Sequence, residues 1–164
     1  MNKLAIFTKR VITPETVIPQ GVVLVEGKKI LEVGQRFDVS FDSSEFQTLH
    51  YEQQTLIPGF IDIHIHGSGG RDVMEGTPEA IEVISSFLAR HGTTSYLATT
   101  VTASPITTIQ AVENIGRLMK EETKGARILG LHLEGPFISE RKRDRKSTRL
   151  NSSHIQKSRM PSSA

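Results

Sequence analysis

Cysteine is absent from this sequence of 164 residues, and no apolar run approaches the length of a membrane helix. Without thiols the chain has neither a disulfide framework nor a thiolate metal site, so a metal would have to be bound by His, Asp or Glu. A membrane helix needs about 18 apolar residues in succession, and the first ten residues lack the apolar stretch of a secretory signal. These absences predict a cytoplasmic protein without a membrane partner.

Excess positive charge is confined to the end of the chain. The formal net charge is +2 and the pI is about 9.0, values that by themselves would favour a nucleic-acid partner. Five of the 20 basic residues but only one of the 18 acidic residues lie in residues 144–164, so residues 1–143 carry a net charge of −2. We therefore expect no nucleic-acid partner.

Residues 144–164 differ in composition from the rest of the chain. They have no helical or strand periodicity, and six of them are serine, which predicts disorder. Their sequence also resembles a translated sequencing-library adapter. We therefore expect the natural sequence to stop near Arg143 and the tail to be an artefact.

Two patterns divide the remaining chain near Pro58. Residues 1–57 contain short Val- and Ile-rich runs joined by turns, typical of a small β domain, with a hairpin around Gly27. Residues 58–143 alternate three strand-like apolar runs with two helical patterns. The three runs are residues 60–66, 95–100 and 128–134.

Both helical patterns begin with a capping hydroxyl followed by proline, at residues 77–78 and 104–105. The first pattern closes at Gly92 and the second runs towards Gly125. The order is therefore β-α-β-α-β, which is typical of a parallel sheet covered by helices. We predict an α/β fold that begins a (β/α)₈ TIM-type barrel and is truncated after three strands, since a whole barrel needs about 250 residues.

The run PGFIDIHIHG, which starts at Pro58, carries the first candidate site residues. Alternation along a strand places Asp62, His64 and His66 on one face, opposite three isoleucines suited to packing beneath helices. Two imidazoles two residues apart can bind one ion. The alternative is that they satisfy hydrogen bonds in a polar core. Their place at the carboxyl end of a barrel-like strand, where barrels keep their active sites, favours the metal.

The run ILGLHLEGPF repeats this alternation. It places His132 and Glu134 on one face and Leu129, Leu131 and Leu133 on the other. Glu134 would complete a His, His, Glu set around a divalent ion and leave positions open for water or substrate. The alternative is a structural carboxylate at the turn that follows. We expect His132 to support a ligand rather than to be one.

The glycine-rich loop at residues 66–76 is a weak signal. It lacks the Lys-Ser or Lys-Thr of a nucleotide phosphate loop and the spacing of a dinucleotide fingerprint. Within it we expect Asp72 to order the loop rather than to act in catalysis. His91, at the end of the first helical pattern, suits the helix dipole and is interpreted as structural.

Together, the segments PGFIDIHIHG, GSGGRDVMEG, HGTTSYLATT and GLHLEGPFIS resemble the amidohydrolase superfamily, and within it the family of N-acetylglucosamine-6-phosphate deacetylases. The resemblance covers roughly the first third of such an enzyme. It implies a complete barrel with a small β domain and a cytoplasmic homodimer. The implied reaction, part of amino sugar catabolism, is hydrolysis of the acetamide of N-acetyl-D-glucosamine 6-phosphate to glucosamine 6-phosphate and acetate.

The same resemblance implies that His64, His66 and Glu134 bind one or two divalent ions, zinc or iron, and that the family's catalytic aspartate lies beyond residue 143. The chain alone would then be an inactive fragment, and a bare metal-binding module is a further alternative. Dihydroorotase- and hydantoinase-like cyclic amidohydrolases share the Asp-x-His-x-His strand. They typically carry a carbamylated lysine in place of the HLEGPF motif.

Overall fold

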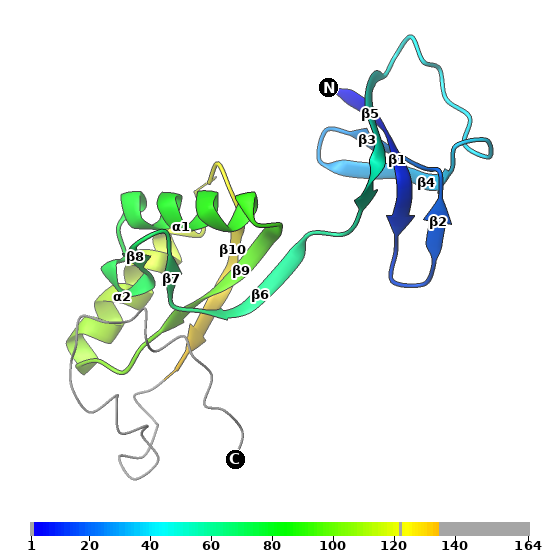
Figure 1. The fold of residues 1–164 in the computed structure, drawn as a ribbon. Coiled ribbons are helices and arrows are strands. Elements are labelled where there is room, and N and C mark those ends of the chain that lie inside the picture. Colours follow the sequence, from blue (N-terminus) through cyan, green and yellow to red (C-terminus); the bar gives the residue numbers. More distant parts are fainter. Residues whose placement is uncertain (1, 122, 135–164) are drawn as a thin grey trace, which may run out of the picture. The chain divides into compact units, whose positions relative to one another are not determined.

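The structure, a computed structural model, describes residues 2–121 and 123–134 (Figure 1). The chain divides into two compact units, Met1–Pro58 and Gly59–Ala164. The tail expected at residues 144–164 lies outside the described residues. Within the described ranges, none of the helices combines the length and hydropathy that a membrane span requires.

The first unit is a β-sheet built around its first strand, β1. Strands β2 and β3 pair antiparallel with β1, β4 pairs antiparallel with β3, and β5 pairs parallel with β1. The hairpin between β3 and β4 turns at Gly27, whose φ is 58°, as the sequence predicted. The strand bounds are β1 Lys3–Ile12, β2 Val17–Pro19, β3 Gly21–Glu26, β4 Lys29–Gln35 and β5 Gln47–Leu56.

The core of this unit comes from the apolar alternation of β1 and β3. Phe7, Val22 and Leu24 are buried together, and Phe41 and Phe46 from the segment before β5 pack against them. The β-branched and aromatic content that predicted strands therefore also supplies the buried face.

The second unit is a three-stranded parallel sheet in the order β10-β9-β6, with helices in its two crossovers. Both helices pack on one face of the sheet (Figure 1), where Tyr96, Ala98 and Ile128 meet apolar residues of the helices. The predicted β-α-β-α-β order is confirmed. The bounds are β6 Phe60–Ile65, α1 Pro78–Arg90, β9 Thr93–Thr100, α2 Pro105–Leu118 and β10 Arg127–Leu133.

The helix starts are as the sequence predicted, but one helix end is not. The Thr77 hydroxyl accepts from Ala80 N and caps α1, and the Ser104 hydroxyl caps α2 in the same way. We expected α2 to run towards Gly125, but it ends at Leu118. A Cβ on Gly125 would lie 2.2 Å from the Ser85 carbonyl oxygen, so the glycine lets the chain after α2 pass closely against α1.

The predicted faces of β6 and β10 are partly wrong. Ile61 and Ile63 are 60% and 67% exposed rather than packed beneath helices, because β6 is the last strand in the sheet order and its register with β9 shifts twice. In β10 the register shifts between Ile128 and Gly130, so Leu129 is the extra, exposed residue of a bulge. Leu131 packs on the core as expected.

The glycine-rich loop after β6 contains structure that the sequence did not predict. It forms the antiparallel pair β7 Gly67–Ser68 and β8 Arg71–Asp72, then the short 3₁₀ helix η1 Val73–Glu75. A Cβ on Gly67 would lie 2.1 Å from the Arg71 carbonyl oxygen, which explains the glycine. The hairpin folds the chain back against the end of β6.

Candidate metal centre

Three candidate ligands meet at the carboxyl end of the parallel sheet. His64 lies in β6, His66 directly follows it, and Glu134 directly follows β10. Parallel strands end at the same edge of a sheet, so residues far apart in sequence converge there. The Nε2 atoms of the two histidines are 3.3 Å apart, and Glu134 Oε2 lies 3.0 Å from that of His64 and 2.8 Å from that of His66.

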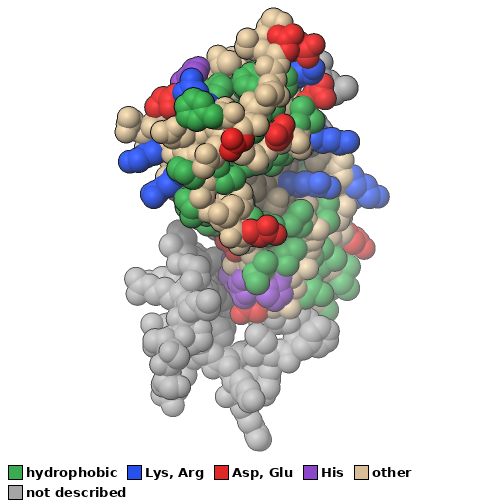
Figure 2. All heavy atoms as spheres, turned by 90° about the vertical axis from the view of Figure 1, so that its right-hand side faces the viewer, with side chains coloured by type: hydrophobic (Ala, Val, Ile, Leu, Met, Phe, Trp, Pro, Cys, Tyr) green, Lys and Arg blue, Asp and Glu red, His purple; other side chains and the backbone are tan. Residues whose placement is uncertain are grey.

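The cluster opens to solvent on one side. Figure 2 shows histidine side chains gathered on the surface beside acidic and hydrophobic side chains. The side chain of His66 is 9% exposed, whereas those of His64 and Glu134 are 46% and 38% exposed. One imidazole is therefore fixed in the protein, and the other two groups face the side from which a substrate would approach.

The tautomer of His66 follows from its neighbours. Its Nδ1 lies 3.2 Å from the Thr99 carbonyl oxygen, which can only accept a hydrogen bond. Nδ1 therefore carries a proton and donates, and in the neutral imidazole the lone pair is on Nε2. That lone pair faces the Glu134 carboxylate and His64.

Several acceptor atoms thus converge with little positive charge between them. Among the described residues the Glu134 carboxylate lies within ion-pair distance of the two imidazoles and of no lysine or arginine. A carboxylate oxygen beside the imidazole lone pair of His66 is unfavourable unless a proton or a cation lies between them. Ligand atoms about 3 Å apart suit an ion bound at about 2.0–2.2 Å, and two imidazoles with a carboxylate suit a divalent metal. The residues present therefore fit a metal ion.

Asp62 and His132 support the cluster without joining it. Asp62 Oδ1 accepts from the backbone N–H of His64 at 3.0 Å. The His132 Nδ1–H donates to the Ile63 carbonyl at 3.1 Å, and its ring meets the His64 ring edge-on, with centroids 4.7 Å apart. The His132 contact links β10 to β6 although β9 lies between them, and the Asp62 and His132 contacts together restrict the orientation of His64.

Asp72 and His91 lie where the sequence suggested structural roles. Asp72 is the N-cap of η1, where its carboxylate accepts from Met74 N and its backbone N–H donates to the Glu75 carboxylate. His91 is the C-cap of α1 and donates from Nδ1 to the Phe87 carbonyl at 2.8 Å. Neither belongs to the group His64, His66 and Glu134.

Sequence reasoning missed Thr99, which contacts His66 and the Ile65 residue before it. Its carbonyl accepts from His66, and its hydroxyl accepts from Ile65 N at 3.0 Å. The available signal was a buried-strand run, TTSYLATT, that ends in two hydroxyls. Only the register of β6 against β9 identifies which of the two threonines, Thr99 or Thr100, lies beside the site.

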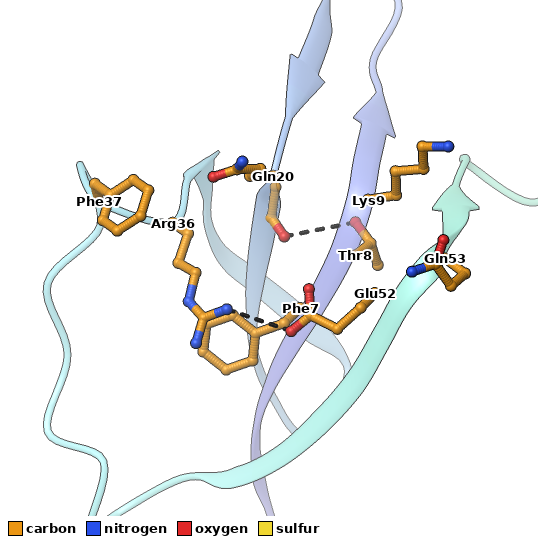
Figure 3. A pocket seen from close by; sticks show the side chains of 9 residues that line it. Phe7, Thr8, Lys9, Gln20, Arg36, Phe37, Glu52 and Gln53 are labelled. Carbon is orange, nitrogen blue, oxygen red and sulfur yellow. Dashed lines mark hydrogen bonds and ion pairs between the residues drawn. The ribbon is translucent and has the colours of Figure 1, made fainter.

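The first unit has a hollow of about 420 Å³, drawn in Figure 3, between β1, β5 and the loop after β4. Arg36 lies over the Phe7 ring, 4.8 Å from its centroid, and points towards Glu52, whose Oε1 is 3.3 Å from Nη1. Two of the charges that line the hollow, those of Arg36 and Glu52, are thus paired with each other. It offers no group of converging ligands like that in the second unit.

Comparison with known proteins identifies similar sequences. The profile described as the amidohydrolase family matches residues 55–159. The N-acetylglucosamine-6-phosphate deacetylase of Bacillus subtilis (strain 168) is 39% identical over 132 residues, which are 79% of this chain and 33% of that protein. An N-acetylgalactosamine-6-phosphate deacetylase of Escherichia coli O157:H7 is 39% identical over 89 residues, or 54% of this chain and 23% of that protein.

The fold is similar to that of a solved structure. The N-acetylglucosamine-6-phosphate deacetylase of Pasteurella multocida matches with a TM-score of 0.75 and 26% identity, over 94% of this chain and 41% of that one. The chain therefore spans about a third of the Bacillus protein and less than half of the Pasteurella chain.

Proposed function

The chain belongs to the amidohydrolase family, and from that premise we propose that it contributes His64, His66 and Glu134 to the metal site of an N-acetylglucosamine-6-phosphate deacetylase. The observation that supports the proposal is the convergence of the three ligand atoms within 4.8 Å of one another, from two strands at one sheet edge. Asp62 and His132 are proposed to support these ligands, and Asp72 to order the adjoining loop.

The proposed ion is divalent, with zinc or iron favoured because two imidazoles and one carboxylate suit either metal. Such an ion, one or two per subunit, lowers the pKa of bound water and polarises an amide carbonyl. Glu134 supplies the negative charge of the site. The His66 Nδ1–H donates to the Thr99 carbonyl, so Nε2 is the nitrogen whose lone pair can bind the ion. His64, the more exposed imidazole, borders the approach to the site.

The rest of the proposal concerns the whole enzyme. We propose a (β/α)₈ barrel with the β unit as its small domain, acting as a cytoplasmic homodimer on a small amino sugar phosphate. It would hydrolyse the acetamide to glucosamine 6-phosphate and acetate. The proton-transferring aspartate of the family would lie beyond residue 143, so the 164-residue chain would bind metal without turning over substrate.

A second substrate is favoured by one relative. The Escherichia coli protein at 39% identity is named for N-acetylgalactosamine 6-phosphate, which carries the same acetamide and phosphate as the glucosamine substrate. The two hexosamines differ in configuration at C4 alone. The metal centre acts on the acetamide and so does not distinguish them.

Metal binding by the chain is the first test. Titration calorimetry with Zn²⁺ should give stoichiometric binding, and a His64→Ala plus His66→Ala variant should bind at least about 100-fold more weakly. His50→Ala is the matched control, since it removes a histidine that also lies beside a glutamate. Absence of Zn²⁺ binding in the unaltered chain, or an equal loss in the control, would contradict the proposal.

Acetate release tests the reaction. An enzyme that contains residues 1–143 in a full-length chain should deacetylate N-acetylglucosamine 6-phosphate, and the rate with the galactosamine isomer ranks the second candidate. The 164-residue chain should release no acetate. Turnover by this chain would refute our assignment of proton transfer to a residue beyond 143.

A further inference from the structure

The hydrogen-bond ladder between β6 and β9 is interrupted beside the two histidines. The register shifts between Asp62 and Ile65, the stretch that contains His64. The backbone N–H of Ile65, between the two imidazole-bearing residues, donates to the hydroxyl of Thr99 at 3.0 Å. A side chain thus binds the peptide that links the histidines.

The Thr99 hydroxyl has one fixed arrangement. It accepts from Ile65 N and donates to the Leu97 carbonyl at 3.3 Å, so its single proton is committed. Thr99 is fully buried, and water does not compete for either bond. Its own carbonyl accepts from His66 Nδ1.

We propose that Thr99 is a positioning residue for the metal centre: its hydroxyl holds the peptide between His64 and His66, and its carbonyl selects the His66 tautomer. This inference rests on the proposed function, because it assigns Thr99 a role towards the same ion. Groups that orient a metal-binding histidine through its second nitrogen keep the ligating nitrogen aimed and basic. Here one residue provides that contact and also fixes the backbone from which the ring projects.

The neighbouring residue separates this role from simple packing. Thr100 is equally buried, but its hydroxyl has no hydrogen-bond partner among the described residues. Alternation along β9 places Thr100 with Tyr96 and Ala98, which pack in the core beneath the helices. Thr99→Val and Thr100→Val each remove one buried hydroxyl from β9. Only Thr99→Val also removes a hydrogen bond to β6.

The test uses Zn²⁺ alone with the 164-residue chain. Thr99→Val should weaken Zn²⁺ affinity about 10- to 100-fold, the usual effect of losing a group that supports a ligand. Thr99→Ser keeps the hydroxyl and should stay within about threefold of the parent, as should Thr100→Val. Unchanged affinity in Thr99→Val, or an equal loss in Thr100→Val or Thr99→Ser, would overturn the inference.

A metal-free measurement distinguishes failure of this inference from failure of the proposed function. Long-range ¹H–¹⁵N spectra of the unaltered chain should show His66 protonated at Nδ1. Thr99→Val should speed amide exchange at Ile65, because it removes the hydroxyl that accepts from this N–H, while Thr99→Ser and Thr100→Val should not. The His66 tautomer should stay the same in all three variants, because each keeps the backbone carbonyl of residue 99. A parent chain that fails to bind Zn²⁺, paired with faster Ile65 exchange in Thr99→Val, would refute the metal site and leave the positioning by Thr99 intact. Unchanged Ile65 exchange in Thr99→Val, or a parent His66 that is not protonated at Nδ1, would refute the positioning itself.

Discussion

Each of the two units places a histidine beside a glutamate, and the two pairs are built differently. His50 and Glu52 lie two residues apart on β5, with His50 Nδ1 3.3 Å from Glu52 Oε1, and both side chains are half exposed. Arg36 contacts the same carboxylate. In the second unit, Glu134 approaches His64 and His66 from a strand 70 residues away in sequence, and no described lysine or arginine neutralises it.

His50 and Glu52 form a surface pair whose charges are matched, whereas His64, His66 and Glu134 form a set of candidate ligands. The charges around Glu52 are already matched, and the His50 ring lies flat on Phe7 with centroids 4.9 Å apart. Around Glu134 no described lysine or arginine matches the charge, so the arrangement favours a proton or a cation between the ligand atoms. Proximity of His and Glu alone therefore does not favour a metal site; the unmatched charge and the buried, oriented imidazole do.

The largest expected effect is on the packing that supports the surface pair. Phe7 lies in the core of the first unit. The His50 ring stacks on the Phe7 ring, and the Arg36 guanidinium lies over it. Phe7→Ala should lower the free energy of opening of β1, measured by amide exchange, by about 3–5 kcal/mol. Phe37→Ala, at a side chain that is 84% exposed, should cost less than about 0.5 kcal/mol. Equal losses would show that Phe7 does not support the pair.

The next effect concerns Glu134. Glu134→Gln should lower Zn²⁺ affinity about 100-fold or more, because the site loses the carboxylate that lies against both imidazoles. The same change should not destabilise the metal-free chain, since an amide N–H can donate to the lone pair on His66 Nε2. Glu52→Gln is the control and should leave Zn²⁺ affinity unchanged. Loss of stability in metal-free Glu134→Gln would contradict the converging-acceptor interpretation.

A smaller effect is expected at alkaline pH in the second unit. Burial raises the pKa of the Tyr96 phenol above its ordinary value of 10.0, and its hydrogen bond with Ser85 opposes this. The neutral phenol is favoured in the folded state, so this stability is full below pH 10 and is lost as pH rises through the folded pKa.

Amide exchange in β9, followed from about pH 8 to 11, should show this loss. Tyr96→Phe should remove it, at a cost of about 1–3 kcal/mol at neutral pH for the unpaired Ser85 hydroxyl. Tyr51→Phe, at an exposed position in the first unit, is the control and should leave the pH profile of β9 unaltered. A profile of Tyr96→Phe that matches the parent would contradict the prediction.

The smallest effect is expected for the charge beside His50. Arg36→Gln removes an exposed ion pair to Glu52 and a cation–π contact to Phe7. The expected cost is below about 1 kcal/mol by urea denaturation, and it should diminish in high salt. A loss of several kcal/mol would contradict this prediction, because such a cost is expected only for a core residue.

Sequence periodicity was sufficient for the long elements and for the residues at strand ends. Thr77 and Ser104 identified both helix starts, and the strand-end positions of His64 and Glu134 anticipated that they would meet at one sheet edge. The pairing of strands fixed what local sequence could not. The bulge that exposes Leu129 and the register that brings Thr99 to Ile65 are both properties of a neighbouring strand.

The short strands and the end of α2 could not be predicted from the local sequence either. The β7–β8 hairpin spans two residues on each side, too few to establish a period, and β2 has three. The early end of α2 is followed by a close passage of Gly125 against the Ser85 carbonyl, a tertiary contact. The exposure of the side chains on β6 likewise depends on whether another strand lies beside β6.

The candidate ligands lie in or directly after the two outer strands of the parallel sheet, with β9 between these strands. An ion shared by His64 and Glu134 would close a loop of 70 residues in a chain that has no cysteine with which to form a disulfide. The unfolded chain does not hold these ligands together, so the ion would stabilise the folded chain by the free energy with which it binds. The proposed metal site would thus also act as a reversible staple, and chelation would loosen the sheet as reduction loosens a disulfide-bonded protein.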